Sequence, residues 1–574
     1  MPATIQYRIS CVNAQQRYIQ FSATFPCPED HLSIHLASWR PGRYELGNFA
    51  KNIKGFRVFD EQNKVLSFEK SNKDTWQIQT TNTQFIRVEY AYYASELNAG
   101  SSFLDDQQLY INPVNCFLFT DQQHAYELTL DIPATWKIAS SLNFQDNRCE
   151  VANFDKLADS PFICSAKLQK ESYEVNGHHF HIWFNNQKFI QWEKVLVDFE
   201  KFTRTQIQDF TEFPVNDFHF LIQTLPNAAY HGVEHLESTV ITLGPNYDVF
   251  GSLYKELLGV SSHELYHVWN VKSIRPAEMH PYNFKEENYS VSGFVYEGIT
   301  TYLGDLYLLR SGVFSLEQYL VELSKQLQKH FDNPARFNYS VGDSSFDTWL
   351  DGYTPGAPGR KVSIYTEGCL LAFVTDMKIR QATKDQYGIQ EVMKQLYFNF
   401  AEKGMGYTWQ DYQQTLENVS GISFKDFFDR FIFGTEPYES ILVEACTYFG
   451  LEIHQVPSAS YAEARLGMKV LPKGPDAQVI AIYPGAPADN GGLALNDEII
   501  AVNNMRLQGN LDQWLTYEEE GMKTVLVNRG GRLIEKSLPE VNRFFYQTHS
   551  VKKLDFLDQH QRKAFKYWAN LSID

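Results

Sequence analysis

The sequence predicts a multidomain α+β fold, in which a β-rich region, a mainly helical region and a smaller mixed region follow one another. Three observations predict it. The chain has 574 residues, too many for one hydrophobic core. Apolar residues make up 43% and charged residues 21% of it, which is a globular composition. The period of the hydrophobic pattern changes twice, near residues 187 and 455.

Residues 1–168 are expected to form an antiparallel β-sandwich or sheet domain. Short segments in this region alternate in hydrophobicity or are rich in β-branched and aromatic residues, and Pro, Gly, Asn and Asp separate them. The clearest strands cover 18–25, 32–38, 56–60, 75–81, 85–93 and 125–133. The stretch WRPGRY (39–44) contains a Pro-Gly pair, which by itself predicts only a turn.

Residues 169–452 are expected to form a second, mainly helical domain. In the segment 188–210, Phe189, Val195 and Phe199 recur at helical spacing together with other apolar residues, which predicts an amphipathic helix. One further strand is expected at 217–226, and further helices at 253–270, 292–310, 316–330, 366–382, 389–402 and 409–418.

Residues 453–545 change to a pattern of strands, turns and a short helix, which predicts a third, smaller domain. Residues 546–574 are expected to form a helical tail, and from residue 552 onward this tail is predicted as a single amphipathic helix.

Charge and cysteine usage exclude several classes of protein. The formal net charge is -18 and no run of Lys and Arg stands out, which argues against nucleic-acid or anionic-membrane partners. The seven cysteines are scattered without CxxC spacing, so neither a disulfide framework nor a cysteine zinc site is expected. No signal-peptide pattern and no apolar run of about 18 residues is seen, so a cytoplasmic protein is the expectation.

The stretch SSHELYHVWN (261–270) contains the clearest catalytic candidates. His263 and His267 are four residues apart, so both imidazoles lie on one face of a helix. Zinc binds histidine nitrogen readily, and a catalytic zinc site takes three protein ligands and leaves one position for water. Glu264 would lie beside that position as a base, and zinc lowers the pKa of water to about 7. The pattern predicts a zinc hydrolase; the alternative is a chance HExxH on an ordinary buried helix.

The third ligand decides between these alternatives. Downstream candidates are Glu278, Glu286, Glu287 and Glu297, of which the first three lie in a polar, Pro-containing stretch that is typical of a loop. Glu297 lies in a strongly apolar helical pattern, where a lone carboxylate is costly and a metal would compensate it. Asp305, two turns on, is either a partner for a histidine N–H or a solvated acid.

The segments HELYHVWNVKSIRPAEM and YEGITTYLGDLYLLRSG closely resemble the glycyl aminopeptidase family of PDZ-containing zinc metallopeptidases, peptidase family M61. This family is a distant relative of aminopeptidase N. The resemblance implies a thermolysin-like gluzincin catalytic domain with one zinc ion per chain. It implies His263, His267 and Glu297 as zinc ligands and Glu264 as general base and acid.

The segment YHGVEHLEST (230–239) looks like the family's Gly-Gly-x-Glu-His strand, although His231 replaces the first glycine. By this match Glu234 binds the free α-amino group of the substrate. A carboxylate beside the metal pairs with an ammonium group but gains nothing from an internal peptide bond, so it favours exopeptidase action. The alternative for Glu234 is a surface acid on an edge strand.

The segment SIYTEGCLLAFVTDMKIR (363–380) resembles the family's Ser-Tyr-Tyr-x-Lys-Gly helix start, with Glu367 in place of the lysine. By this match the hydroxyl of Tyr365 donates to the oxyanion of the tetrahedral intermediate, an interaction that can be worth about 3 kcal/mol. The alternative for Tyr365 is a core tyrosine.

The segment 471–504 resembles a PDZ domain, which implies a groove that binds a peptide C-terminus beside a strand. Arg465–Met468 would be its carboxylate-binding loop, and a structural or substrate-presenting role for the domain is equally open.

Together these features predict a zinc-dependent aminopeptidase that removes N-terminal residues from peptides with a free N-terminus. The resemblance implies a preference for small residues, glycine or alanine. Two alternatives remain. One is a non-catalytic PDZ peptide-binding or chaperone-like protein with a structural zinc site. The other is a different zinc hydrolase on the same scaffold, such as an endopeptidase.

Overall fold

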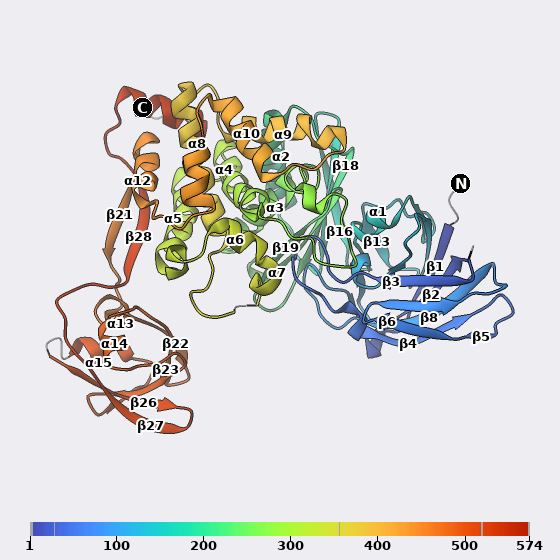
Figure 1. The fold of residues 1–574 in the computed structure, drawn as a ribbon, viewed down its shortest axis with the longest axis horizontal. Helices are drawn as coiled ribbons and strands as arrows, with labels where there is room; N and C mark the ends of the chain where they lie inside the picture. The colour runs from blue at the N-terminus through green and yellow to red at the C-terminus, as the bar shows by residue number, and fades with distance from the viewer. Residues whose placement is uncertain (1–3, 28, 355, 518–520, 572–574) are drawn as a thin grey trace. The chain divides into compact units, whose positions relative to one another are not determined.

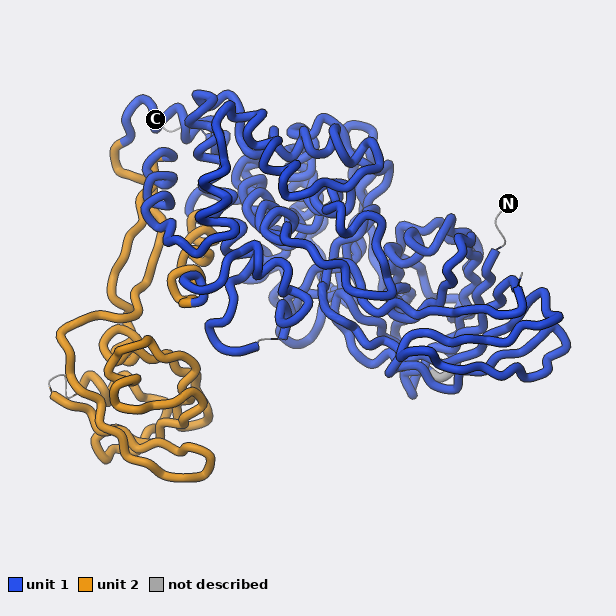
Figure 2. The backbone as a smooth tube through the Cα atoms, in the orientation of Figure 1, with its two compact units in different colours: residues 1–319, 335–449, 557–574 blue, residues 320–334, 450–556 orange. Residues whose placement is uncertain are grey.

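The computed structural model describes residues 4–27, 29–354, 356–517 and 521–571. The chain forms two compact units (Figure 2), the first made of residues 1–319, 335–449 and 557–574 and the second of residues 320–334 and 450–556. In the first unit a β-rich N-terminal part precedes a mainly helical part, seen in Figure 1 as blue strands followed by green to orange helices. The predicted multidomain α+β organisation with a β-rich N-terminal domain is confirmed.

Three sheets form the N-terminal part. Their strands are β1 (Thr4–Asn13), β2 (Tyr18–Pro26), β3 (His31–Leu36), β4 (Ile53–Phe59), β5 (Val65–Leu66), β6 (Phe68–Asn72), β7 (Thr75–Gln79), β8 (Phe85–Tyr93), β9 (Phe103–Leu104), β10 (Gln108–Ile111), β11 (Leu118–Phe119), β12 (Ala125–Asp131), β13 (Lys137–Ser140), β14 (Arg148–Val151) and β15 (Phe162–Ser165). The sheet orders are β14-β12-β1-β2-β8-β4-β5, β13-β15-β10-β9 and β11-β3-β7-β6. The large sheet is mainly antiparallel, but β1 and β12 run parallel.

Aromatic side chains fill the core of these sheets and extend it into the helical part. Along β2 and β8 every second residue is buried, and Phe21 stacks on Tyr90 with ring centroids 4.9 Å apart. Trp39 and Tyr44 are fully buried, and the ring centroid of Tyr44 lies 5.2 Å from that of Tyr296 in the helical part. The segment that carries WRPGRY is therefore packed against the helical part.

A five-stranded sheet opens the helical part. Its strands are β16 (Gln169–Val175), β17 (His178–Asn185), β18 (Asp217–Thr224), β20 (Ser238–Gly244) and β19 (Ala229–Glu234), hydrogen-bonded in the order β16-β17-β18-β20-β19. Strands β17, β18 and β20 are parallel, and the edge strand β19 is antiparallel to β20. Helix α2 (Trp192–Phe210) connects β17 to β18. Phe189 was predicted on its apolar face, which is wrong: the helix begins at Trp192, and Phe189 lies before it and is 75% exposed.

Helices form the rest of this part. They are α3 (Tyr254–Tyr266), α4 (Thr300–Arg310), α6 (Val341–Phe346), α7 (Thr348–Asp351), α8 (Ile364–Thr383), α9 (Ile389–Asn399), α10 (Trp409–Ser420), α11 (Lys425–Phe427), α12 (Glu439–Tyr448) and α16 (Gln559–Ala569); α5 (Leu316–Asp332) begins in the first unit and continues into the second. The short helix α1 (Phe154–Ala158) lies in the N-terminal part, between β14 and β15. The six helices predicted between residues 253 and 418 are present as α3, α4, α5, α8, α9 and α10. Among the described residues every helix is too short or too polar to span a lipid bilayer.

The second unit contains a small mixed domain. Its elements are β21 (Leu451–Pro457), α13 (Tyr461–Ala464), β22 (Met468–Lys473), β23 (Asp476–Ile482), α14 (Pro487–Asn490), β24 (Glu498–Val502), β25 (Met505–Arg506), α15 (Leu511–Tyr517), β26 (Lys523–Arg529), β27 (Arg532–Leu538) and β28 (Gln547–Lys553). The prediction of one helix from residue 552 onward is wrong at its start. Lys552 and Lys553 end β28, whose backbone groups pair with β21, and the helix begins only at Gln559.

Candidate active site

Helix α3 presents the two histidines of the HExxH stretch at its C-terminal end. The two Nε2 atoms of His263 and His267 lie 3.0 Å apart, so both imidazoles are directed to one point. His267 is 1% exposed, and its Nδ1 lies 2.7 Å from the carbonyl oxygen of Asn270. When His267 is neutral and its Nδ1–H donates to this carbonyl, Nε2 keeps its lone pair for a ligand.

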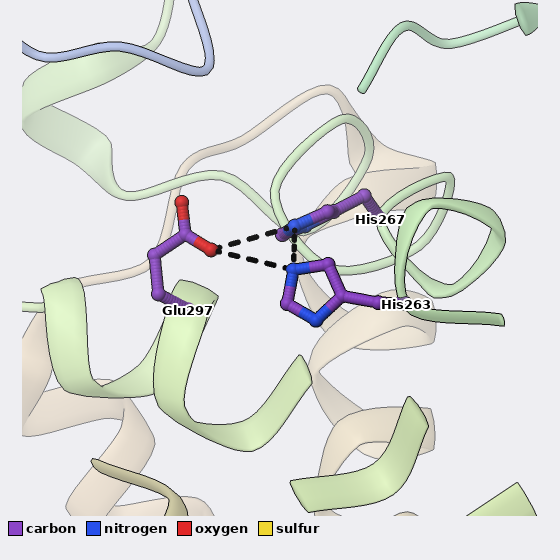
Figure 3. Close-up of side chains that lie close together, drawn as sticks. All are labelled: His263, His267 and Glu297. Atoms are coloured by element: carbon purple, nitrogen blue, oxygen red, sulfur yellow. Dashed lines mark hydrogen bonds and ion pairs between the residues drawn. The ribbon is translucent and has the colours of Figure 1, made fainter. Parts of the chain in front are cut away.

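Glu297 completes a group of three donors. Its Oε2 atom lies 3.8 Å from Nε2 of His263 and 3.4 Å from Nε2 of His267, as Figure 3 shows. It lies in a π-helical turn (Phe294–Ile299) directly before α4, a local irregularity that is common at functional sites. Among the described residues, two groups of metal-binding side chains are found, and this is one of them.

Glycine contacts fix the spacing of these helices. Gly298 lies against the backbone of Gly368 in α8, and a Cβ atom on either residue would overlap the backbone of the facing segment. Gly304 in α4 lies against the backbone of His263, and a Cβ atom there would come within 3.1 Å of the His263 Cα. The close backbone approach brings Glu297 to the histidines.

The pKa shifts describe an ionised carboxylate between two imidazoles. Burial alone would raise the pKa of Glu297, but hydrogen bonds from His263 and His267 outweigh it and lower the pKa to about 2. Burial alone would lower the pKa of His267, but the neighbouring carboxylates of Glu297, Glu234 and Glu264 outweigh it and raise the pKa to about 10. Burial lowers the pKa of His263.

A zinc ion fits this donor set. Two ligands at 2.0–2.1 Å from a tetrahedral ion lie about 3.3 Å apart, close to the separations between these donor atoms. Two nitrogens and one carboxylate oxygen are a ligand set that zinc takes in hydrolases. The geometry therefore holds three ligands together and leaves the remaining side of a metal to other groups.

Two more carboxylates border the donors. Glu264 and Glu234 form the second group of metal-binding side chains together with His267, and they are 5% and 4% exposed. Oε2 of Glu264 and Oε1 of Glu234 are buried and have no hydrogen-bond partner among the described residues. Strand β19 passes so close to Glu264 that a Cβ atom on Gly232 would overlap its carboxylate. Buried acceptors of this kind require a partner, which a ligand can supply.

Tyr365 lies in the first turn of α8. Burial, together with the charges of Glu297 and Glu234, raises its pKa well above the usual value. Tyr365 therefore stays a neutral hydrogen-bond donor beside the two carboxylates.

The turn within WRPGRY closes one side of this site, which the sequence did not suggest. Arg43 N donates to Arg40 O (3.3 Å), and Gly42 has φ 79° at the tip, where a Cβ atom would come within 2.5 Å of Glu234 Oε2. A Pro-Gly turn flanked by two arginines was the available signal, but nothing local says what the turn contacts.

Asp159 joins the N-terminal part to the strand that carries Glu234, and it too was missed. Asp159 Oδ1 accepts from Lys272 Nζ (2.7 Å) and lies 3.1 Å from His235 Nδ1, and Oδ2 accepts from Leu236 N (2.8 Å). His235 and Leu236 directly follow Glu234, so this network fixes the end of β19.

Comparison with known proteins agrees with this architecture. Residues 6–166 match the N-terminal domain of peptidase family M61, and residues 256–371 match the M61 glycyl aminopeptidase domain. An aminopeptidase N family protein from Idiomarina loihiensis has a similar structure, with TM-score 0.90 and 25% identity over 98% of this chain and 100% of that one. A search of curated proteins finds no significant match.

An M1 zinc metallopeptidase from Deinococcus radiodurans is more distant, with TM-score 0.47 and 11% identity over 76% of this chain and 94% of that one, which is too low to support a conclusion. The two matched M61 domains follow one another in the chain. The second contains His263, His267 and Glu297, and Glu234 lies between the two. The chain therefore carries regions that match the N-terminal and catalytic domains of the M61 glycyl aminopeptidase family, and it is a metallo-aminopeptidase.

Proposed function

We propose that the protein is a zinc-dependent aminopeptidase that removes N-terminal residues, preferably glycine or alanine, from peptides. The observation that carries the proposal is the pair of buried, unpartnered carboxylate oxygens, on Glu264 and Glu234, beside the three donor atoms of His263, His267 and Glu297. The preference for small residues rests on the M61 glycyl aminopeptidase match.

His263, His267 and Glu297 are proposed to hold one zinc ion. When bound, zinc supplies a Lewis acid that polarises a peptide carbonyl and makes water acidic near neutral pH. Asn270 O supports this arrangement, because it holds the Nδ1–H of His267 and so orients the ring.

Glu264 is proposed to move the proton during hydrolysis. Its carboxylate borders the donor group and is almost completely buried, so it is shielded from bulk water. It takes a proton from the attacking water and gives it to the amine that leaves when the peptide bond breaks. Tyr365 is proposed to donate its hydroxyl to the negative oxygen that develops on the substrate carbonyl.

Glu234 is proposed to bind the free α-ammonium group of the substrate. Its Oε1 is a buried acceptor without a partner, which an ammonium group can satisfy with a charge-assisted hydrogen bond. Gly42 lies against the other oxygen of the carboxylate, so the turn leaves little room for residues beyond the substrate's N-terminus. Both features favour exopeptidase action over an endopeptidase.

The alternative of a structural zinc site in a non-catalytic peptide-binding protein is less well supported. A structural site is closed by four protein ligands, whereas the present group offers three and adjoins two carboxylates, each with one oxygen that lacks a partner among the described residues. Residues 453–545 are proposed to be a PDZ domain, in which a peptide C-terminus would bind near Arg465–Met468.

The test combines a metal assay with kinetics. The purified protein should contain about one zinc ion per chain and hydrolyse Gly- and Ala-anilides faster than Leu-anilide. Glu264→Gln should keep the zinc and lose about a thousandfold in kcat, because the proton transfer is removed. A metal-free active enzyme, or a fully active Glu264→Gln variant, would contradict the proposal.

A further inference from the structure

Arg40 is a buried cation without a paired anion. It is 5% exposed, and within the described part of the chain its guanidinium makes one hydrogen bond, from Nη1 to Pro41 O (3.3 Å), and no ion pair. Its neighbour Arg43 differs, since Arg43 pairs with Glu45 and its guanidinium lies 4.9 Å from the ring centroid of Tyr353. A buried charge of this kind is costly unless an anion compensates it.

The side chain is held in a fixed position. Gly100 lies against the guanidinium so closely that a Cβ atom at residue 100 would overlap it. Gly100 is fixed in turn, because Asn115 Nδ2 donates to its carbonyl oxygen (2.9 Å). A flexible surface arginine would not need such a support, and preorganisation of this kind is typical of binding residues.

Arg40 also lines a cavity and lies near enough to Glu234 for their charges to interact. The cavity has a volume of about 310 Å³, and its walls also include the charged side chains of Arg43, Glu45, Lys51 and Glu96 and the polar one of Asn52. Its charge acts on Glu234, Glu264 and His231, and burial lowers its own pKa. Cavities of this size hold a small ligand, and the polar walls suit a charged group rather than an apolar one.

The position in the turn limits the distance to the amine-binding carboxylate. Arg40 is two residues from Gly42, so the Cα atoms of these two residues are at most about 7 Å apart. Gly42 in turn contacts Glu234. An extended tripeptide spans about 10 Å from its amine to its carboxylate. The backbone separation in the turn and the length of the Arg40 side chain together match the length of a di- or tripeptide. The guanidinium can therefore reach the C-terminus of such a peptide while its amine is held at Glu234.

We propose that Arg40 binds the C-terminal carboxylate of short peptide substrates, so that di- and tripeptides with a free C-terminus are favoured over amidated or longer peptides. The guanidinium donates two parallel hydrogen bonds to a carboxylate, a geometry that a peptide carbonyl cannot match. The protein carries a net charge of -18, which disfavours the approach of an anion. A buried positive group such as Arg40 therefore favours the binding of a carboxylate at its own position. The inference rests on the proposed aminopeptidase function.

The experiment compares kcat/KM of the full-length zinc-loaded enzyme for Ala-Ala-Ala and for its C-terminal amide. Wild type should prefer the free acid by about tenfold or more, the effect of a charged hydrogen bond. In Arg40→Met and in Gly100→Ala, which keeps the charge but displaces the guanidinium, the ratio should fall toward one. Arg40→Lys should retain part of it.

Arg43→Gln is the matched control. Arg43 lies in the same turn and lines the same cavity, but it already pairs with Glu45, so this variant should stay near the wild-type ratio. Equal rates on acid and amide in wild type, or an unchanged ratio in Arg40→Met, overturn the role of Arg40 and leave the aminopeptidase intact. Failure of wild type to cleave either peptide overturns the proposed function and this inference with it. Equal rates in wild type overturn the inference even where a variant fails to fold.

Discussion

The helices that carry the three metal donors are built differently from the wall around Glu234, by which we mean Glu234, the turn that contains Gly42, and Asp159. His263 and His267 come from successive turns of one helix, and Glu297 joins them through a glycine contact between packed helices. Glu234 is instead bordered by the turn that contains Gly42, and the residues that follow it are held by Asp159 at the end of α1, so the segments involved lie far apart in the sequence. The chemistry is thus encoded locally, whereas the surroundings that select the substrate depend on long-range packing.

The difference separates two kinds of mutational effect. Changes among the donors should abolish hydrolysis of every substrate, because they remove the group that activates the carbonyl. Changes in the wall should alter the choice of substrate, or the stability of the packing between the β-rich and helical parts, more than the chemistry itself.

The largest effect is expected for Glu297→Gln, which weakens the third donor. Loss of a group that only hydrogen-bonds to a metal ligand already lowers metal affinity ten- to a hundredfold. Weakening a ligand itself should therefore lower zinc affinity by more than about a hundredfold, and activity should fall with it. Glu278→Gln is the matched control, since Glu278 is an exposed carboxylate from the same sequence region. Zinc content after dialysis and Ala-anilide hydrolysis measure both. Retention of zinc by Glu297→Gln would contradict the assignment.

A smaller effect on rate is expected for Glu234→Gln, which keeps the shape of the side chain and removes its charge. The α-ammonium group loses its ionic partner, so kcat/KM for Ala-anilide should fall about a hundredfold. Zinc content should stay at the wild-type level, which separates this variant from Glu297→Gln. A Glu234→Gln enzyme with wild-type kcat/KM would show that the wall does not bind the amine.

Asp159→Asn tests the wall through stability. Burial alone would raise the pKa of Asp159, but Lys272 and His235 outweigh it and hold the pKa well below the usual value. A depressed pKa means that the carboxylate stabilises the fold above its unfolded pKa of about 3.9, and that this stability is lost as the pH falls further.

At pH 7, Asp159→Asn should lower the free energy of unfolding by about 3 kcal/mol, because Lys272, whose side chain is 2% exposed, loses its anion. The gap between variant and wild type should narrow below about pH 4. Urea titrations at both pH values measure it. A gap that is independent of pH would exclude the ion pair as the cause.

The contrast between the two regions also explains what the sequence could predict. The i, i+4 spacing of His263 and His267, and the carboxylate of Glu297 within an apolar helical pattern, are local signals, and the structure brings these side chains together. The contacts of Arg40 and Asp159 depend on how distant segments pack, so WRPGRY predicted only a turn. The two wrong predictions concern element boundaries. Phe189 lies before the first turn of α2, and the start of the tail helix is delayed because residues up to Lys553 pair with β21.

The smallest effect tests the packing that joins the donor helices. In Gly298→Ala, the new methyl group meets the backbone of Gly368, which cannot rotate away, so overpacking should cost about 1–3 kcal/mol and displace Glu297 from the histidines. Gly259→Ala is the matched control: Gly259 lies in α3 with open space around its Cβ position, and alanine there should stabilise the helix by about 1 kcal/mol. Thermal unfolding with zinc affinity separates the two outcomes. If Gly298→Ala left both unchanged, the glycine contact would not be what places Glu297 beside the histidines.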